Sequence, residues 1–394
     1  MEFQYYIPTR ILFGPGKLNE LATTSFLPGK KALIVISAGT SMRKHGYLER
    51  VQSLLKENGV ESVVFDKILA NPILAHVHEG AAMAREMDCD FVIGLGGGSS
   101  MDSAKSIALM AKNDGDYWDY VNGGSGKGEP VKNGALPIVA ITTTAGTGTE
   151  ADPWTVITKT ETNEKIGFGI DETFPVLSIV DPELMVSVPP KLTAYQGMDA
   201  FFHAVEGYLA NIRQPVSDAY ALSSIKLVAE NLAAAVEDGT NIEARSAIAW
   251  ANTQSGMVES TSCVISHHSL GHALSALYPE VPHGAGLVLL SVAYFTYLIE
   301  NSPEASRFTD MARAMGESVD ALPRVEQPMA FIRALKRLIV TIGLADLKLT
   351  DFGVEKSSAH ALAENAKDTM GFLFTLDPCE LSMDVTTKII EDSF

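Results

Sequence analysis

Short, almost wholly apolar runs alternate with helical stretches through the first part of the chain. The runs are rich in Val and Ile and occupy residues 31–39, 61–66, 90–98, 136–144 and 177–183. Several of them are apolar on both faces, which is typical of parallel strands buried between two layers of helices. Residues 47–59 and 77–88, which lie between runs, have the helical period instead. This alternation predicts a doubly wound α/β sheet over residues 1–185.

The pattern changes after residue 185. Pro189 and Pro190 end the preceding element, and Thr193 and Gln196 have the spacing of a capping box that opens a helix. From there to the last residue the pattern is helical, without a strand-like run. The most apolar run, residues 284–299, is shorter than a membrane span and begins with two glycines, so it is interpreted as a buried core helix. The sequence therefore predicts an all-helical domain over residues 186–394.

Charge and composition exclude several functional classes. The chain has 394 residues, and its formal net charge of −18 lacks the basic stripe that nucleic acid binding needs. Three widely spaced cysteines without a CxxC pair indicate a reduced, cytoplasmic setting. The N-terminus shows no basic region followed by an apolar core, so neither a signal peptide nor a membrane partner is expected.

A glycine cluster joins one predicted strand to the next helix, within "DFVIGLGGGSSMDSAKS". Gly96, Gly97 and Gly98 let the backbone approach a ligand closely, and the following helix offers unpaired N–H groups to a phosphate. The alternative is a tight turn in which Ser99 caps the helix and Asp102 completes a capping box.

A second loop strengthens the phosphate-binding hypothesis. "ITTTAGTGTE" places Thr143, Thr144 and Thr147 just beyond another strand. Ligands of open α/β sheets bind at the carboxyl ends of the strands, so two such loops favour a dinucleotide. The alternative, that these threonines only make turn hydrogen bonds, stays open.

Five potential metal ligands are grouped in the second domain. Asp199 and His203 are four residues apart on one predicted helix face, and His268 and His272 repeat that spacing. His283 follows a turn with two prolines. These nitrogen and oxygen donors, without a thiolate, suit Fe²⁺ or Zn²⁺. The spacing alone leaves open which member of the His268 and His272 pair would bind the ion. The remaining histidines are interpreted as core residues with satisfied hydrogen bonds: His45, His76, His78, His267 and His360.

The motifs together resemble the iron-containing, or group III, alcohol dehydrogenases. The resemblance rests on "IPTRILFGPG", "LGGGSSMDSAK", "TTAGTGTEAD", "GMDAFFHAVEGY" and "HHSLGHALSALYPEVPHGAG", which follow one another in family order over about three-quarters of the chain. It implies a Rossmann-like α/β dinucleotide-binding domain over residues 1–185, followed by an all-α metal-binding domain over 186–394. Dehydroquinate synthase shares this architecture.

The resemblance also assigns residues. It implies that Asp199, His203, His268 and His283 bind the metal, and that His272 lies in the proton path. The cofactor contacts that it implies are Asn71, Gly97, Gly98, Ser99, Asp102, Thr143, Thr144, Thr147, Val156 and Lys165. The chain departs from the family at Ser37, where NAD-preferring members carry an acidic residue for the ribose hydroxyls. Without that carboxylate, Arg43 or Lys44 could reach a 2′-phosphate, so both NAD and NADP remain candidates.

The implied function is reversible hydride transfer between a small primary alcohol, or its aldehyde, and C4 of a nicotinamide. The divalent ion would act as a Lewis acid. The resemblance also implies a homodimer or a larger homo-oligomer. Two alternatives stay open: a metal- and NAD-dependent lyase of the dehydroquinate synthase type, and a non-catalytic nucleotide-binding protein with a structural metal. A charged sugar acid would need a pocket rich in Lys and Arg, which the sequence around residues 199–283 does not show.

Overall fold

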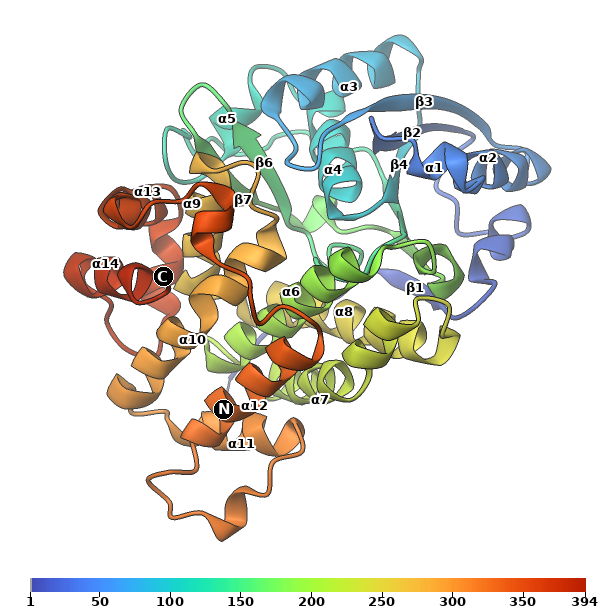
Figure 1. Cartoon of the computed structure of the whole chain (residues 1–394). Helices are drawn as coiled ribbons and strands as arrows, with labels where there is room; N and C mark the ends of the chain where they lie inside the picture. The colour runs from blue at the N-terminus through green and yellow to red at the C-terminus, as the bar shows by residue number, and fades with distance from the viewer. Residues whose placement is uncertain (1) are drawn as a thin grey trace. The chain divides into compact units, whose positions relative to one another are not determined.

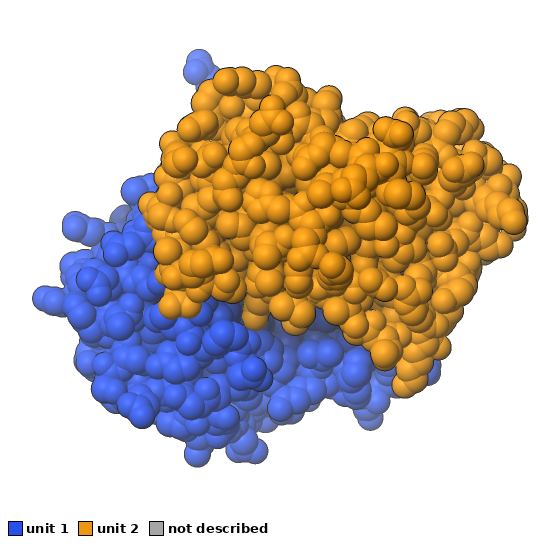
Figure 2. All heavy atoms as spheres, turned by 90° about the horizontal axis from the view of Figure 1, so that it is seen from above, with its two compact units in different colours: residues 1–5, 188–394 blue, residues 6–187 orange. Residues whose placement is uncertain are grey.

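The computed structural model describes residues 2–394, which separate into two compact units (Figure 2). One unit runs from Tyr6 to Ser187. The other runs from Val188 to Phe394 and also includes the N-terminal residues up to Tyr5.

The first unit is built on a six-stranded sheet with the order β1-β8-β5-β4-β2-β3, in which every paired strand is parallel. Its strands are β1 (Arg10–Phe13), β2 (Lys31–Ser37), β3 (Glu61–Ile68), β4 (Phe91–Gly96), β5 (Ile138–Thr142) and β8 (Leu177–Val180). The predicted parallel α/β sheet is therefore confirmed. The sequence interpretation missed the short edge strand β1 and the separate antiparallel pair of β6 (Thr155–Lys159) and β7 (Glu164–Phe168).

Both faces of the sheet are buried, as the apolar runs indicated. Val35 of β2 belongs to one core cluster with Ile107 of α4 (Gly98–Lys112), and α3 (Leu74–Glu86) contributes to the same cluster. The next residue towards the N-terminus, Ile34, belongs to a second cluster with Val51 of α2 (Tyr47–Glu57). Neighbouring strand residues point to opposite faces, so an uninterrupted apolar run supplies both clusters. The remaining α-helices of this unit are α1 (Ser41–Lys44) and α5 (Tyr117–Tyr120).

The second unit is helical, and the described residues after β8 contain no strand. The helices are α6 (Pro190–Leu209), α7 (Pro215–Glu237), α8 (Ile242–Ser262), α9 (Ser266–Leu277), α10 (His283–Asn301), α11 (Ser306–Ala314), α12 (Met329–Thr341), α13 (Ala359–Met370) and α14 (Met383–Glu391) (Figure 1). Helix α6 packs against α7, α8 and α10, while α9 packs against α10 and α13. The predicted all-helical second half is confirmed.

The predicted start of α6 is wrong. The helix begins at Pro190, with Pro189 as its N-cap, so the two prolines open this helix. Proline suits the first helical position because its fixed φ is already helical and its missing N–H would have no partner there. Thr193 lies inside the first turn, where its hydroxyl donates to the carbonyls of Val188 and Pro189.

Helix α10 contains the apolar run that was interpreted as a core helix. It is the one helix among residues 2–394 that is long and apolar enough to cross a membrane by length and composition. Most of it is buried within the protein, including Leu287, Tyr294, Phe295 and Leu298. This burial is what a core helix requires.

Candidate metal and cofactor site

Helices α6, α9 and α10 supply the candidate metal ligands. Asp199, His203 and Glu206 are spaced at i, i+4 and i+7 on α6, so they share one face, and all three are buried. Helix α9 carries His268 in its first turn, and His283 is the first residue of α10.

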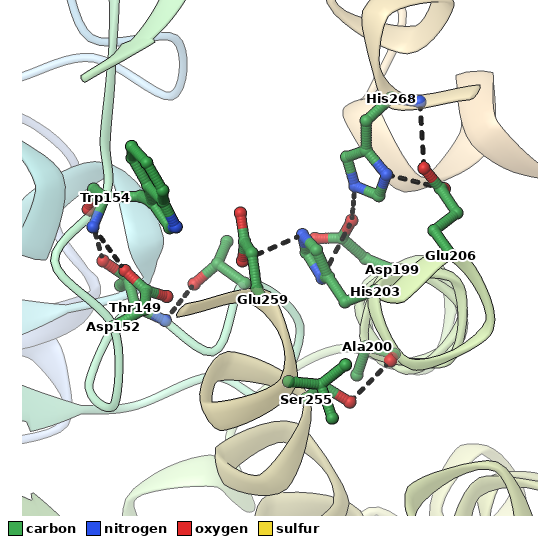
Figure 3. A network of polar contacts seen from close by, with 12 residues as sticks. Thr149, Asp152, Trp154, Asp199, Ala200, His203, Glu206, Ser255, Glu259 and His268 are labelled. Atoms are coloured by element: carbon green, nitrogen blue, oxygen red, sulfur yellow. Dashed lines mark hydrogen bonds and ion pairs between the residues drawn. The ribbon is translucent and has the colours of Figure 1, made fainter. Parts of the chain in front are cut away.

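Three donor atoms converge on one point. Asp199 Oδ1 lies 3.6 Å from His268 Nε2 (Figure 3) and 3.6 Å from His283 Nε2. Ligands of a tetrahedral Zn²⁺, each at about 2.0–2.1 Å, lie roughly 3.4 Å apart. Asp199 Oδ1 and His268 Nε2 are buried, and neither has a hydrogen-bond partner among the described residues. Such groups are costly to bury unless a cation compensates them, so the three side chains fit a divalent metal ion.

The electrostatics of His268 support the same conclusion. Burial disfavours protonation of this histidine, but the carboxylates of Glu206 and Asp199 outweigh burial and raise its pKa to about 10. Glu206 accepts from Nδ1 at 2.7 Å, so the second proton of the charged imidazole is on Nε2. A metal ion can take the place of the proton at this nitrogen.

His203 lies beside this group but does not join it. Its Nδ1 is 3.9 Å from Asp199 Oδ1, whereas its Nε2 is 3.6 Å from Glu259 Oε2 of α8 (Figure 3). Its ring stacks on that of His268, with the centroids 4.4 Å apart. The compact set of donor atoms is formed by Asp199, His268 and His283.

His272 lies one turn beyond His268 on α9 and is also buried. Its Nδ1 is 2.8 Å from Met370 Sδ, and its ring centroid is 5.1 Å from that of His283. It therefore adjoins the donor group while one of its nitrogens faces a thioether.

The sequence interpretation missed Glu206. This fully buried carboxylate contacts both His267 and His268, and the two histidines outweigh the effect of burial and lower its pKa to about 2. Its position on the same face as Asp199, two turns away, was the signal that could have identified it.

His267 confirms the interpretation of a buried, hydrogen-bonded histidine, since its ring nitrogens lie 2.7 Å from Glu206 Oε1 and 3.0 Å from the Leu287 carbonyl. The same interpretation is wrong for the other four. His45 and His360 are exposed, and His76 and His78 are only half-buried.

The glycine turn and the threonine loop contact each other in the first unit. A Cβ atom on Gly97 would lie 3.1 Å from Thr144 Oγ1, and one on Gly98 would lie 2.4 Å from Thr147 Cγ2. Both segments follow neighbouring strands, β4 and β5, whose carboxyl ends share one edge of the sheet. The close approach explains the glycines at these positions.

Ser99 and Asp102 do not form the capping box of the alternative interpretation. Helix α4 begins at Gly98 with Gly97 as its N-cap, and Ser99 Oγ donates to the Ala70 carbonyl. Asp102 is buried, and it accepts from Thr149 Oγ1 at 2.8 Å and from the Val156 amide at 3.0 Å. Burial raises its pKa to about 6.

Lys105 holds the C-terminal end of the threonine loop, near Thr149, in place through hydrogen bonds. Its fully buried ammonium group donates to Thr149 Oγ1 at 2.6 Å, to Asp152 Oδ1 at 3.1 Å and to the Trp154 carbonyl at 2.8 Å. Figure 3 shows Thr149, Asp152 and Trp154 within this network. The cation compensates the buried Asp152 and holds the loop in one conformation.

The remaining cofactor candidates lie in the same unit. Lys165 Nζ donates to Asn71 Oδ1 at 3.1 Å. Ser37 is the last residue of β2, which neighbours β4. Arg43 pairs with Asp66 at 2.7 Å, and both side chains are about half exposed.

A parallel α/β unit with a glycine turn at a strand end, followed by helices that gather imidazoles around a carboxylate, is the arrangement expected of an enzyme that uses a nucleotide and a metal ion. Comparison with known proteins agrees. The family model "Iron-containing alcohol dehydrogenase" matches residues 8–182, and "Fe-containing alcohol dehydrogenase family, C-terminal" matches residues 193–394. The chain belongs to the iron-containing alcohol dehydrogenase family and is an oxidoreductase.

Individual relatives cover nearly the whole chain. It is similar to 1,3-propanediol dehydrogenase of Klebsiella pneumoniae, with 36% identity over 94% of both chains. It is 35% identical to the NAD-dependent methanol dehydrogenase of Bacillus methanolicus, over 92% of both chains. The solved structure of an archaeal halo-thermophilic alcohol dehydrogenase from a Red Sea brine pool superposes with a TM-score of 0.94 and 35% identity, covering 100% of this chain and 99% of that one.

Proposed function

We propose that this protein catalyses reversible hydride transfer between a small primary alcohol, or its aldehyde, and C4 of the nicotinamide of NAD or NADP. The observation that carries the proposal is the convergence of Asp199, His268 and His283 at 3.6 Å separations. Both matched family models are those of alcohol dehydrogenases, which favours this function over the lyase and over the non-catalytic binding protein.

Asp199, His268 and His283 would hold Fe²⁺ or Zn²⁺. The family resemblance implies His203 as the fourth ligand, and its ring would have to turn from Glu259 towards Asp199 to bind the ion. The ion supplies a Lewis acid that polarises the substrate oxygen. His272 would move the substrate proton to solvent, because it adjoins His283 and its Nδ1 already faces Met370 Sδ. Nε2 is then the nitrogen that exchanges the proton.

The cofactor would bind to the first unit. The N-terminus of α4, at Gly97, Gly98 and Ser99, offers backbone N–H groups to the pyrophosphate. Thr143, Thr144 and Thr147 line the adjoining loop, and Asn71, Val156 and Lys165 are the further proposed contacts. Asp102 would act by holding Thr149 and the Val156 amide, which occupy its two carboxylate oxygens.

We further propose that NADP is accepted as well as NAD. Ser37 places no carboxylate at the end of β2 to repel a 2′-phosphate. Arg43 is held only by an exposed ion pair with Asp66, and such pairs contribute about 0–1 kcal/mol, so a phosphate could compete for the guanidinium. We also propose that the protein forms a homodimer or a larger homo-oligomer and that it is located in the cytoplasm.

The test is an assay of NADH and NADPH oxidation at 340 nm with a series of short aldehydes, on protein reconstituted anaerobically with Fe²⁺ or with Zn²⁺. Elemental analysis of the purified protein identifies the native metal. Metal-dependent oxidation of either nucleotide supports the proposal. No oxidation with any aldehyde, on folded protein that has bound metal, would refute it.

A further inference from the structure

Glu206 is a fully buried carboxylate that contacts two histidines with one oxygen. Glu206 Oε1 lies 2.7 Å from His267 Nδ1 and 2.7 Å from His268 Nδ1. Oε2 accepts from the backbone N–H groups of Ile265 at 3.1 Å and of His268 at 3.3 Å. One side chain of α6 therefore holds both the start of α9 and the ring of His268.

These contacts fix the tautomer of His268. A carboxylate only accepts hydrogen bonds, so the proton of the neutral imidazole must be on Nδ1. Nε2 is then the nitrogen that is left to bind an ion, and it lies 3.6 Å from Asp199 Oδ1. The backbone N–H of His268 also donates to Glu206, so one carboxylate holds both the backbone and the ring of this residue.

His267 holds Glu206 in turn. Its second nitrogen, Nε2, is 3.0 Å from the Leu287 carbonyl, and its ring packs against those of Phe202 and Phe295, with centroids 4.9 Å and 5.0 Å away. The ring of His267 is fully buried and is held at both of its nitrogens, so it keeps its contact with the carboxylate in place. Glu206 is thus held in place by His267 and can support the ring of His268.

We propose that Glu206 is a positioning residue of the metal site, which holds a proton on Nδ1 of His268 and so directs Nε2 to the ion. This inference rests on the proposed function, because it requires that His268 binds a metal. Carboxylates that orient a ligating imidazole in this way typically change metal affinity by 10- to 100-fold.

Asp377 provides a matched control. It too is buried and holds the first turn of α9, since its Oδ1 accepts from the Ser266 N–H at 3.1 Å and from the Tyr294 hydroxyl at 2.8 Å. The hydrogen bonds of Asp377 involve neither histidine. A general loosening of α9 would therefore affect metal binding in variants of either carboxylate, whereas positioning of His268 concerns Glu206 alone.

The experiment compares Zn²⁺ and Co²⁺ affinity of the wild type, Glu206→Gln and Asp377→Asn by competition with a chromophoric chelator, with folding checked by circular dichroism. The glutamine side chain has one accepting oxygen in place of two, and its NH₂ group only donates, so it cannot keep all four contacts of the carboxylate. The Glu206→Gln site should therefore bind both ions about 10- to 100-fold more weakly. The Co²⁺ absorption bands of this variant should shift. Asp377→Asn should match the wild type in metal affinity and in its Co²⁺ absorption bands. Equal affinity in all three proteins, or an equal loss in both variants, would overturn the proposal.

Wild-type protein supplies a second test should Glu206→Gln fail to fold. In protein labelled with ¹⁵N-histidine and bound to ¹¹³Cd²⁺, the cadmium should couple to Nε2 of His268 while Nδ1 keeps its proton. Coupling to Nδ1 would overturn the proposal. If the wild type binds no metal in either experiment, the proposed function itself fails and this inference fails with it, which distinguishes that result from a loss confined to Glu206→Gln.

Discussion

Two carboxylates face opposite nitrogens of a single imidazole, that of His268. Glu206 accepts from Nδ1, and Asp199 lies 3.6 Å from Nε2. His272, one turn further along the same helix, instead has a thioether beside its Nδ1. Two histidines of one helix thus differ in their surroundings, which is why different roles are proposed for them.

That difference predicts a contrast between two variants. His268→Ala should lose bound metal and activity together, because it removes one of the three converging donors. His272→Ala should keep the metal, while turnover falls about 10²- to 10⁴-fold, the usual contribution of proton transfer by a positioned side chain. The test is to measure metal content by elemental analysis, and kcat, on the same preparations of both variants. Loss of metal from His272→Ala would show that the roles are reversed.

A second residue predicts a pH dependence of stability. Burial raises the pKa of Asp377 to about 7, above the value of about 3.9 expected in the unfolded chain. Ionisation therefore costs the folded state more than the unfolded state. The penalty is absent below about pH 4, grows between pH 4 and pH 7, and is complete above that range.

The Asp377→Asn variant stays neutral at every pH. Its free energy of unfolding relative to the wild type should rise from pH 4 to pH 8 by about 2–4 kcal/mol, at 1.36 kcal/mol for each unit of pKa shift. Urea unfolding at several pH values measures this difference. A difference that does not change with pH would contradict the assignment of a raised pKa.

At the scale of elements, the loop after β5 is held between the glycine turn and the buried Lys105. Thr147 contacts the backbone at Gly98, and Thr149 accepts from the ammonium group. Neither contact is made by exposed side chains that could rearrange at low cost. The threonine loop therefore belongs to the rigid part of the first unit, which suits a cofactor site because little ordering is needed on binding.

Replacing Lys105 tests the support for this loop. Lys105→Met should destabilise the protein by about 3–5 kcal/mol, because Asp152 would remain buried without its cation. The matched control is Lys112→Met, at the exposed end of the same helix, which should change stability by less than about 0.5 kcal/mol. Urea unfolding of both variants gives the comparison. Similar values for the two lysines would contradict the buried role.

The contact between turn and loop gives a further prediction. A methyl group at Gly98 would overlap Thr147 Cγ2, and overpacking of this kind costs about 1–3 kcal/mol. If the loop moves to relieve it, NADH binding by Gly98→Ala should weaken by roughly 5- to 150-fold. Adding Thr147→Ser, which removes that methyl group, should restore part of the affinity. Fluorescence titration with NADH measures these affinities. Unchanged binding by Gly98→Ala would contradict the prediction.

At the scale of the whole molecule, a bound ion would join helices that are far apart in sequence. Asp199 is on α6, His268 is on α9 and His283 opens α10. A ligand that binds only the folded state stabilises it, by about 2.7 kcal/mol at a concentration of 100 times Kd. For a unit of this size, such a contribution corresponds to a shift in Tm of roughly 5–10 °C.

Removal of the metal by a chelator should therefore lower Tm by that amount, and addition of Zn²⁺ should restore it. Differential scanning calorimetry of chelated and reconstituted protein measures the shift. His268→Ala serves as the control, since its Tm should no longer respond to Zn²⁺. A wild-type Tm that is insensitive to the metal would contradict a site that links α6, α9 and α10.

The sequence by itself determined the class of fold and the kind of chemistry. Buried parallel strands must be apolar on both faces, so β2, β4 and β5 were visible as apolar runs. The four-residue edge strand β1 is partly exposed and gave no such signal. The i, i+4 spacing of Asp199 and His203 showed that both project from one helix face, because helix geometry fixes local direction.

Tertiary structure alone decided which groups meet. Helical spacing does not specify what lies across from a face, so it could not show that Asp199 meets His268 and His283 while His203 turns towards Glu259. It also could not show that Glu206 reaches a histidine 62 residues further along the chain. The packing of α6 against α10, and of α10 against α9, creates these contacts. That packing depends on the fit of whole helices, which no local pattern contains.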